Sequence, residues 1–193
     1  MTRRRLFVAV EIPDAAQDAV DAAIDPWRDA LRAARWVPRA NRHVTVRFVG
    51  WTAPELVGAV TDAVRATAAA TPRFDLAVTA AGRFPPRGKA RVLWIGLDDP
   101  AGALAVTAGR LQTRMADALP PEARAFTPHL TVARARPPIR VPDGWAAADV
   151  EPSRWTVEHL VLFESHLGRP HARYEPLERC ALVNVADPRP DPG

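Results

Sequence analysis

Two short segments of the chain combine a histidine and a threonine in the same pattern. Residues 43–46 read His-Val-Thr-Val and residues 129–132 read His-Leu-Thr-Val, 86 residues further along. Both lie in runs of apolar and β-branched residues, which favour strands. Because side chains alternate across a strand, the histidine and threonine of each copy share one face and the apolar residues point into the core. Each copy therefore presents an imidazole and a hydroxyl, and two copies can surround one cleft.

Two imidazoles with two hydroxyls suit a substitution at phosphorus. A neutral imidazole can take a proton from an attacking water while a protonated one gives a proton to the leaving oxygen, because the pKa of histidine lies near neutral pH. The hydroxyls of Thr45 and Thr131 can donate hydrogen bonds to non-bridging phosphate oxygens. A metal site is not favoured, since each strand supplies one ligand and no carboxylate or cysteine follows at ligand spacing. The pattern therefore predicts neither a metal nor a cofactor.

The composition is that of a globular protein. The chain has 193 residues, of which 48% are hydrophobic and 25% charged, so it can bury a full core and is neither a disordered chain nor a membrane protein. It contains 25 arginines and one lysine, Lys89, but 22 acidic residues hold the net charge to +4. Residues 1–97 carry +6 and the rest −2, which gives only modest steering toward a phosphate chain.

The cysteine content and the start of the chain bear on its compartment. The single cysteine, Cys180, stands in an apolar run, which excludes an intrachain disulfide and predicts a buried thiol in a reducing cytoplasm. The basic start resembles a signal peptide, but its short apolar run is stopped by Glu11 and Pro13. No stretch approaches the length of a membrane span. We expect a soluble, cytoplasmic protein.

The elements that must position the motifs alternate between strands and helices. Pro13 and Asp14 open a helix expected to run to about Arg35, and Pro54 opens a second that ends before Thr71. Two pairs of successive strands have the spacing of antiparallel hairpins, which favours an α+β fold over a doubly wound sheet. The expected strands are residues 5–12, 43–50, 74–80, 90–97, 129–134, 155–164 and 174–183, with a third helix at 101–119 and a proline-rich connection at 137–152.

Beyond the two motifs, the chain resembles the 2H (two-histidine) phosphoesterases, and within them the LigT-like RNA 2′,3′-cyclic phosphodiesterases. The resemblance covers nearly the whole chain. The residues that carry it are Arg5-Leu6-Phe7-Val8-Ala9, Trp36-Val37-Pro38, residues 41–50, Phe84-Pro85, Arg91-Val92-Leu93-Trp94, residues 126–134 and Leu162-Phe163-Glu164-Ser165.

The resemblance implies a fold and an activity. The fold is a single bilobal α+β domain over residues 1–186, pseudo-symmetric, with two antiparallel sheets lining a central cleft, helices outside and a proline-rich tail at 187–193. Each half carries one motif. The implied reaction is the metal-independent hydrolysis of a 2′,3′-cyclic phosphate at an RNA end, such as that of a tRNA fragment, to a 2′-phosphate. The implied protein is a monomer that does not bind membranes.

The resemblance also assigns roles by position. His43 is the proton donor to the leaving 3′ oxygen and His129 the proton acceptor from water, although the two near-equivalent motifs by themselves allow the reverse. Thr45 and Thr131 hold the phosphate oxygens, and Arg134 matches the family's phosphate-contacting arginine. In an ideal strand Arg134 faces away from His129, so its role requires a β-bulge or a strand end at this point.

Two aromatic residues and three other activities complete the hypotheses. Phe7 and Phe48 are candidates for stacking on a base, with a place in the core as the alternative for each. The same site could act on small nucleotide or ADP-ribose cyclic phosphates, or join RNA ends through a 2′,5′ linkage in the reverse direction. A non-catalytic RNA- or nucleotide-binding module is disfavoured, because binding alone does not need a paired acid and base.

Overall fold

The computed structural model describes residues 2–122, 125–169 and 171–184, and the tail expected at 187–193 lies outside them. Within the described residues the strands form one nine-stranded sheet in the order β7-β4-β5-β6-β3-β1-β8-β9, with β2 paired to β6. The neighbouring strands are antiparallel. Their bounds are β1 Arg4–Glu11, β2 Arg35–Trp36, β3 His43–Thr52, β4 Phe74–Phe84, β5 Ala90–Asp98, β6 Leu130–Ile139, β7 Arg154–Val157, β8 His159–His166 and β9 Arg173–Ala181.

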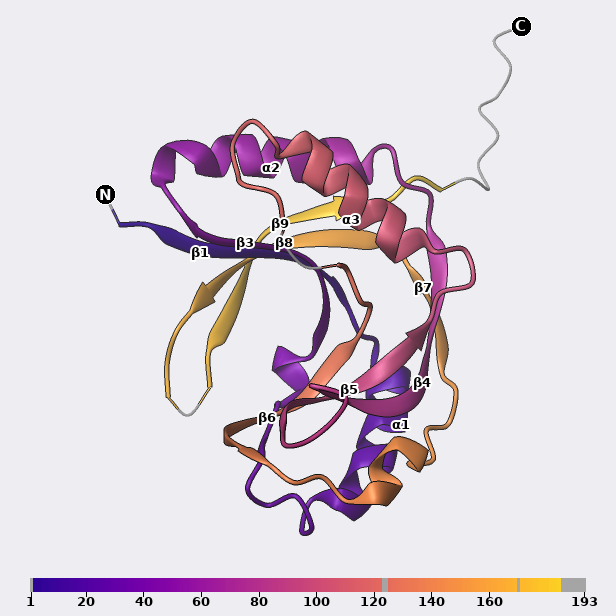
Figure 1. The fold of residues 1–193 in the computed structure, drawn as a ribbon. Coiled ribbons are helices and arrows are strands. Elements are labelled where there is room, and N and C mark those ends of the chain that lie inside the picture. Colours follow the sequence, from indigo (N-terminus) through magenta and orange to yellow (C-terminus); the bar gives the residue numbers. More distant parts are fainter. Residues whose placement is uncertain (1, 123–124, 170, 185–193) are drawn as a thin grey trace, which may run out of the picture.

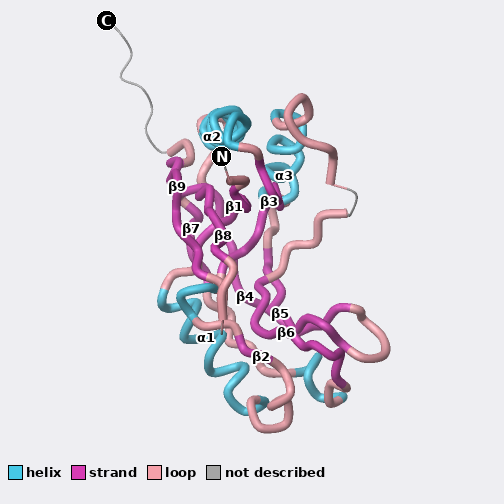
Figure 2. Tube along the Cα trace, turned by 90° about the vertical axis from the view of Figure 1, so that its left-hand side faces the viewer, coloured by secondary structure: helices cyan, strands magenta, loops and turns pink. Residues whose placement is uncertain are grey.

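The sheet curls into two halves, and helices cover the outside of each (Figure 1). α2 (Pro54–Ala68) packs on β8 and β9, and α3 (Ala103–Arg114) packs on β3. α1 (Asp14–Ile24) contacts β4 in the other half. Figure 2 shows α2 and α3 at one end of the molecule and α1 toward the opposite end, with strands between them. The α+β class is confirmed, and the two expected sheets are the halves of one continuous sheet.

The two halves meet where β3 pairs with β6. In the register of these strands Val44 stands opposite Leu130, and both are fully buried. Each is the second residue of a His-Thr motif. The pair therefore places the two motifs side by side at the centre of the sheet, which is how a repeat 86 residues apart in sequence becomes one site.

Several boundaries differ from the sequence predictions. The first helix ends at Ile24 and not near Arg35, because Pro26 lacks an amide hydrogen, and only a 3₁₀ turn, η1 (Asp25–Trp27), follows. The third helix ends earlier than predicted, and β6 continues through the first part of the predicted connection. The strand predicted at 155–164 is divided at Glu158, because β7 pairs with β4 in one half and β8 pairs with β1 in the other.

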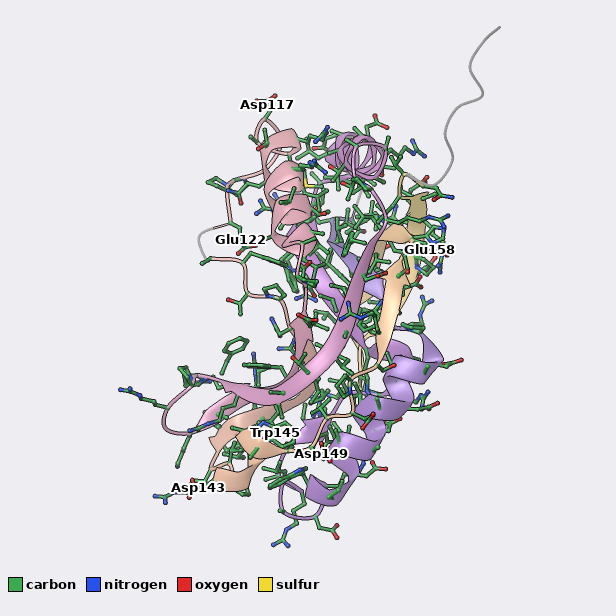
Figure 3. The ribbon with its side chains drawn as sticks, turned by 90° about the vertical axis from the view of Figure 1, so that its right-hand side faces the viewer. Asp117, Glu122, Asp143, Trp145, Asp149 and Glu158 are labelled. Atoms are coloured by element: carbon green, nitrogen blue, oxygen red, sulfur yellow. The ribbon has the colours of Figure 1, made fainter. Side chains whose placement is uncertain are left out.

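A continuous apolar core lies between the sheet and its helices. Cys180 belongs to this core as a free thiol and is 8% exposed, so the prediction of a buried thiol is confirmed. Trp145, in the 3₁₀ helix η3 (Asp143–Ala147), is buried beside β4 and donates its Nε1–H to the Gly82 carbonyl at 2.8 Å (Figure 3). Among the described residues, no helix is both long and apolar enough to cross a membrane.

A buried arginine ties the start of β3 to α1. Arg42 is 6% exposed and donates to the Val37 carbonyl, to Gln17 Oε1 at 3.2 Å and to Asp21 Oδ1 at 2.5 Å. It follows the 3₁₀ helix η2 (Arg39–Asn41) and directly precedes His43. These bonds therefore fix the backbone that enters the first motif.

Replacing Asp21 with asparagine is expected to destabilise the fold by about 3 kcal/mol, because it leaves the buried Arg42 guanidinium without its carboxylate. Partial burial raises the pKa of Asp21, but the hydrogen bonds and charges of Arg42 and Arg39 outweigh burial and hold it below its ordinary value. The ion pair therefore stabilises the fold above the unfolded-state pKa, and this stabilisation is lost as the pH falls through the folded-state pKa.

Urea denaturation of the wild type and Asp21→Asn measures both effects. The difference in free energy of unfolding is expected to be full at neutral pH and to shrink in acid. Asp62→Asn, which changes an exposed acid on α2, is the matched control. Equal stability of wild type and Asp21→Asn at neutral pH would show that the pair does not anchor β3.

Candidate active site

The two His-Thr motifs face each other at the junction of the halves. Because β3 and β6 are antiparallel and the second residues of the two motifs are register partners, His43 lies beside Thr131 and Thr45 beside His129. The apolar residues of both motifs point into the core, so the four polar side chains share the opposite face. All four are half-buried. The structure thus brings together both histidines and both threonines predicted from the sequence.

A β-bulge follows each motif at the same offset. The register of β3 against β1 shifts after Thr45, and the register of β6 against β5 shifts after Thr131. Two consecutive residues are buried at each bulge. The bulge reverses the alternation of side chains, so the next residue, Phe48 on β3 and Arg134 on β6, lies on the histidine face. The bulge that Arg134 requires is present, and its charge acts on both imidazoles.

Each imidazole is oriented by a backbone carbonyl two residues before it. His43 Nδ1 lies 2.8 Å from the Asn41 carbonyl oxygen, and His129 Nδ1 lies 2.7 Å from the Thr127 carbonyl oxygen. A carbonyl oxygen can only accept a hydrogen bond, so Nδ1 carries a proton in both rings. In the neutral ring Nε2 is then the unprotonated nitrogen. Nε2 is therefore the atom that can take up or release a proton on each side of the site.

Aromatic rings pack around both histidines. The ring centroids of Phe7 and Tyr174 lie 4.7 and 5.1 Å from that of His43, and the Phe84 ring stands edge-on to His129 at 5.1 Å. Phe7 is only 2% exposed, and this burial contradicts the prediction that it stacks on a base. It packs against the first histidine because the rings of His43, Phe163 and Tyr174 surround it on this face of the sheet. Phe7 therefore supports His43.

Phe48 occupies a different environment. It is 44% exposed, so it is not a core aromatic. The guanidinium of Arg5 lies 5.3 Å from the centroid of its ring and is held by a hydrogen bond of 3.0 Å to Ser165 Oγ. An exposed ring next to a cation on the histidine face is a surface on which a nucleobase can stack.

Burial and positive charge lower the pKa of both imidazoles. The pKa of His43 is lowered to about 4: burial is the main cause, the Asn41 carbonyl opposes it, and the charges of Arg134 and His129 act in the same direction as burial. Burial followed by the charge of Arg134 lowers the pKa of His129, against the opposing effect of the Thr127 carbonyl. Both rings are therefore mainly neutral at physiological pH in the free protein. An anion bound between them would favour their protonation.

Sequence reasoning missed the residues that hold the histidines in place from other segments. The carbonyls of Asn41 and Thr127 belong to the backbone and leave no signature in the sequence. The Asn41 amide also donates to the Ala172 carbonyl at 2.6 Å, which ties the first motif to the β8–β9 connection. Tyr174, the single tyrosine of the chain, comes from β9 and no local pattern marks it.

Arg47 connects the first motif to the segment that leads to the second. It is 5% exposed and donates to Gln112 Oε1 at 3.0 Å and to the Pro120 carbonyl at 2.9 Å. Glu122 follows in the same connection and lies 3.8 Å from the Arg47 guanidinium (Figure 3). The Arg47 side chain therefore links β3 to α3 and to the start of the connection that follows it.

The donor set of the site suits an anion. It offers two imidazoles, two hydroxyls and the guanidinium of Arg134. Among the residues that the structure describes, no three His, Cys, Asp or Glu side chains cluster closely enough to hold a metal ion.

Comparison with known families fits this geometry. The model of the 2′-5′ RNA ligase superfamily matches residues 13–169, a stretch that holds both His-Thr motifs and both bulges. The chain belongs to the 2′-5′ RNA ligase superfamily.

Its curated relatives in the superfamily include proteins named RNA 2′,3′-cyclic phosphodiesterase. One, from Geobacillus stearothermophilus, is 24% identical over 100% of this chain, which spans only 62% of that relative's length. Another, from Escherichia coli strain K12, is 29% identical and covers 93% of this chain and 97% of its own.

A solved structure of the superfamily has the same fold. The crystal structure of Escherichia coli LigT in its apo form matches with a TM-score of 0.74 at 26% identity, covering 95% of this chain and 100% of that one. The resemblance to LigT-like 2H phosphoesterases is therefore confirmed.

Proposed function

We propose that the protein hydrolyses the 2′,3′-cyclic phosphate at an RNA end to a 2′-phosphomonoester. The observation that carries this proposal is the matched pair of imidazoles, each with Nδ1–H bound to a carbonyl and Nε2 left for proton transfer. A binding site needs no such pair, whereas a phosphodiesterase that works without a metal needs one acid and one base. The names of the curated relatives support RNA as the substrate. Ends of tRNA fragments, a cytoplasmic location and a monomeric state remain predictions.

The proposed reaction is an in-line substitution at phosphorus. His129 Nε2 takes a proton from water as the water oxygen bonds to phosphorus. The bond from phosphorus to the 3′ oxygen breaks, and His43 Nε2 gives its proton to that oxygen. The product carries a 2′-phosphate and a free 3′ hydroxyl. Thr45 and Thr131 donate hydrogen bonds to the non-bridging oxygens, and Arg134 offsets the charge that develops on them.

Ligation of RNA ends would use the same atoms. If the attacking oxygen is the 5′ hydroxyl of a second RNA end in place of water, His129 can deprotonate it, the bond to the 3′ oxygen breaks as before, and the product has a 2′,5′ linkage. The superfamily carries the name of this reaction. We propose hydrolysis as the main direction, because water is present at far higher concentration than an RNA end.

An RNA oligonucleotide ending in a 2′,3′-cyclic phosphate tests the proposal. We expect conversion to the 2′-phosphate, identified by its resistance to an enzyme specific for 3′-phosphates, and we expect the rate to be unchanged in EDTA. A 3′-phosphate product would contradict the assigned bond cleavage, and loss of activity in EDTA would contradict catalysis by the two imidazoles alone.

Removing the exposed ring of Phe48 is expected to weaken substrate binding. Stacking of a base on an aromatic ring contributes about 1–3 kcal/mol, so Phe48→Ala should raise KM by roughly 5- to 160-fold with a smaller effect on kcat. Trp51→Ala, which removes another exposed aromatic ring of β3, is the matched control. Ribose 2′,3′-cyclic phosphate, which has no base, should not distinguish wild type from Phe48→Ala, and an equal loss on this substrate would contradict stacking.

A further inference from the structure

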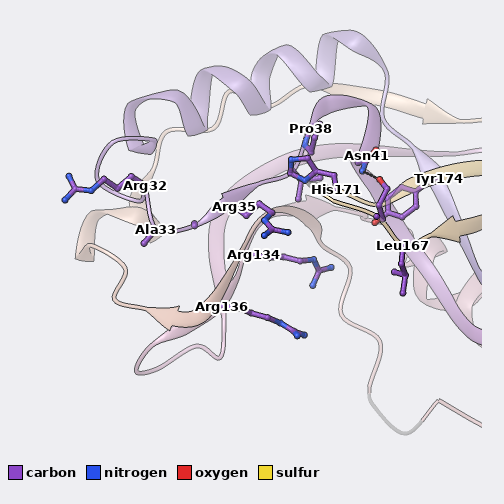
Figure 4. Close-up of a pocket in the computed structure, with 14 residues that line it drawn as sticks. Arg32, Ala33, Arg35, Pro38, Asn41, Arg134, Arg136, Leu167, His171 and Tyr174 are labelled. Atoms are coloured by element: carbon purple, nitrogen blue, oxygen red, sulfur yellow. Dashed lines mark hydrogen bonds between the residues drawn. The ribbon is translucent and has the colours of Figure 1, made fainter.

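A cavity adjoins the histidine pair, and Arg134 is the one side chain of its lining that the proposed reaction uses. Its volume is about 660 Å³, and it lies between residues 32–41, β6 and the β8–β9 connection (Figure 4). Asn41, Arg134 and Tyr174 line it and also contact or act on the imidazoles. The cavity therefore opens onto the site from the side of β6, and a ligand held between the histidines can extend into it.

The lining of the cavity is positively charged. Arg32, Arg35, Arg134 and Arg136 contribute guanidinium groups, and His171 contributes an imidazole. No aspartate or glutamate is among the described residues that line it. A cavity of this charge selects an anionic ligand.

Two of these arginines extend from the same strand toward the same space. Arg134 and Arg136 are two residues apart on β6, which sets their Cα atoms about 7 Å apart, and Figure 4 shows both side chains projecting in one direction. The positive charge of Arg136 contributes to lowering the pKa of Arg134, after the larger effect of burial. In the part of the chain that the structure describes, neither has a carboxylate within ion-pair distance, whereas Arg39, Arg42 and Arg65 are paired with acids.

Two like charges held side by side without acids indicate two anionic groups in the ligand. The first is the cyclic phosphate beside Arg134. At an RNA end, the nucleoside that carries the 2′,3′-cyclic phosphate has its other phosphate on the 5′ oxygen of the same ribose. This phosphate is the next anion along the chain. The step from Arg134 to Arg136 along β6 leads away from the histidines and into the cavity.

We propose that this cavity binds the phosphate on the 5′ oxygen of the terminal nucleoside, with Arg136 as its main contact. The inference rests on the proposed function and specifies its substrate class: a cyclic phosphate end that continues in a 5′ phosphate. That phosphate can be the phosphodiester of an RNA chain or the terminal phosphate of a mononucleotide. The shared chemistry is a singly or doubly charged phosphate that guanidinium groups bind.

The test compares three substrates: a nucleoside 2′,3′-cyclic phosphate, the same compound with a 5′-phosphate, and a dinucleotide ending in the cyclic phosphate. For the wild type we expect kcat/KM to rise about 10-fold or more when a 5′ phosphate is present, as for a charge-assisted contact. Arg136→Gln should remove most of this rise and leave the rate on the bare nucleoside cyclic phosphate close to that of the wild type. Arg114→Gln, which removes an exposed arginine at the end of α3, should retain the rise.

The outcomes distinguish an RNA phosphodiester from a mononucleotide phosphate. They also distinguish failure of the 5′-phosphate site from failure of the proposed function. A rise already complete with the 5′-phosphomononucleotide supports the cavity as a site for either source, and a rise that needs the dinucleotide supports the RNA chain. Equal kcat/KM on all three substrates, or an equal loss on all three in Arg136→Gln, overturns the inference. Failure of the wild type to open any of the three cyclic phosphates would instead overturn the proposed function.

Discussion

His129→Ala and His43→Ala are each expected to lower turnover of a 2′,3′-cyclic phosphate end by about 10²–10⁴-fold, the usual contribution of a positioned acid or base. Each change removes one Nε2 and leaves its partner unable to complete the proton transfers. Steady-state rates of the single variants and the double variant measure the effect. His166→Ala is the matched control, because its Nε2 is bound to Glu175 at 3.1 Å outside the motifs, and it should keep its activity. Full activity in the double variant would rule out this mechanism.

A substrate with a better leaving group assigns the two roles. When sulfur replaces the 3′ oxygen, the leaving thiolate needs no proton, so the variant without the acid should recover much of its rate and the variant without the base should not. The family assignment predicts recovery in His43→Ala. The pKa of His43, lowered to about 4 mainly by burial, disfavours a protonated His43 in the free protein and so favours the opposite order. Recovery of the rate in His129→Ala alone would show that His129 is the acid and His43 the base.

Arg134→Gln is expected to lower kcat/KM by about 10²–10³-fold, the cost of removing one donor that stabilises a developing oxyanion. It is also expected to change the pH dependence. Burial is the main cause of the low pKa of both imidazoles, and the charge of Arg134 lowers each further. Without that charge both pKa values rise, so the limbs of the kcat/KM profile set by the imidazoles move to higher pH.

Arg134→Lys separates the two effects of the guanidinium. Lysine keeps the positive charge but not the forked geometry, so the limbs should stay near their wild-type positions while kcat/KM is only partly restored. Arg140→Gln, which removes an arginine just beyond the end of β6, is the control for net charge. Limbs that do not move in Arg134→Gln would show that its charge does not reach the histidines.

Much of the site follows from local sequence pattern. The alternation in residues 43–46 and 129–132 is enough to place His43 with Thr45 and His129 with Thr131, because strand geometry has a period of two. The hairpins of β4 with β5 and of β8 with β9 are likewise visible as paired strand signals, and the structure has both. The end of α1 also has a local signal, because Pro26 lacks the amide hydrogen that a continuing helix requires.

The rest depends on contacts between distant segments. The face of β3 on which Phe48 lies is determined by a register shift against β1, and no residue type within β3 predicts this shift. Phe7 is covered by the rings of His43, Phe163 and Tyr174, which lie on β3, β8 and β9, so its burial depends on segments far along the chain. Tyr174 reaches His43 only once β9 has joined the sheet. Local patterns identify the reacting groups, whereas the pairing of strands determines what surrounds them.

The equal offset of the two bulges bears on regiochemistry. A cyclic phosphate has its 2′ and 3′ oxygens in nearly equivalent positions about phosphorus, and the two motifs are nearly equivalent about the junction of the sheet. Identical halves would accept the ring in either orientation and open either bond. Phe48 and Arg134 hold equivalent places, yet one is an exposed apolar ring and the other a cation. If the proposed reaction is correct, we expect this unlike pair to distinguish the two orientations of the ring, so that the residues after the bulges take part in choosing the bond that breaks.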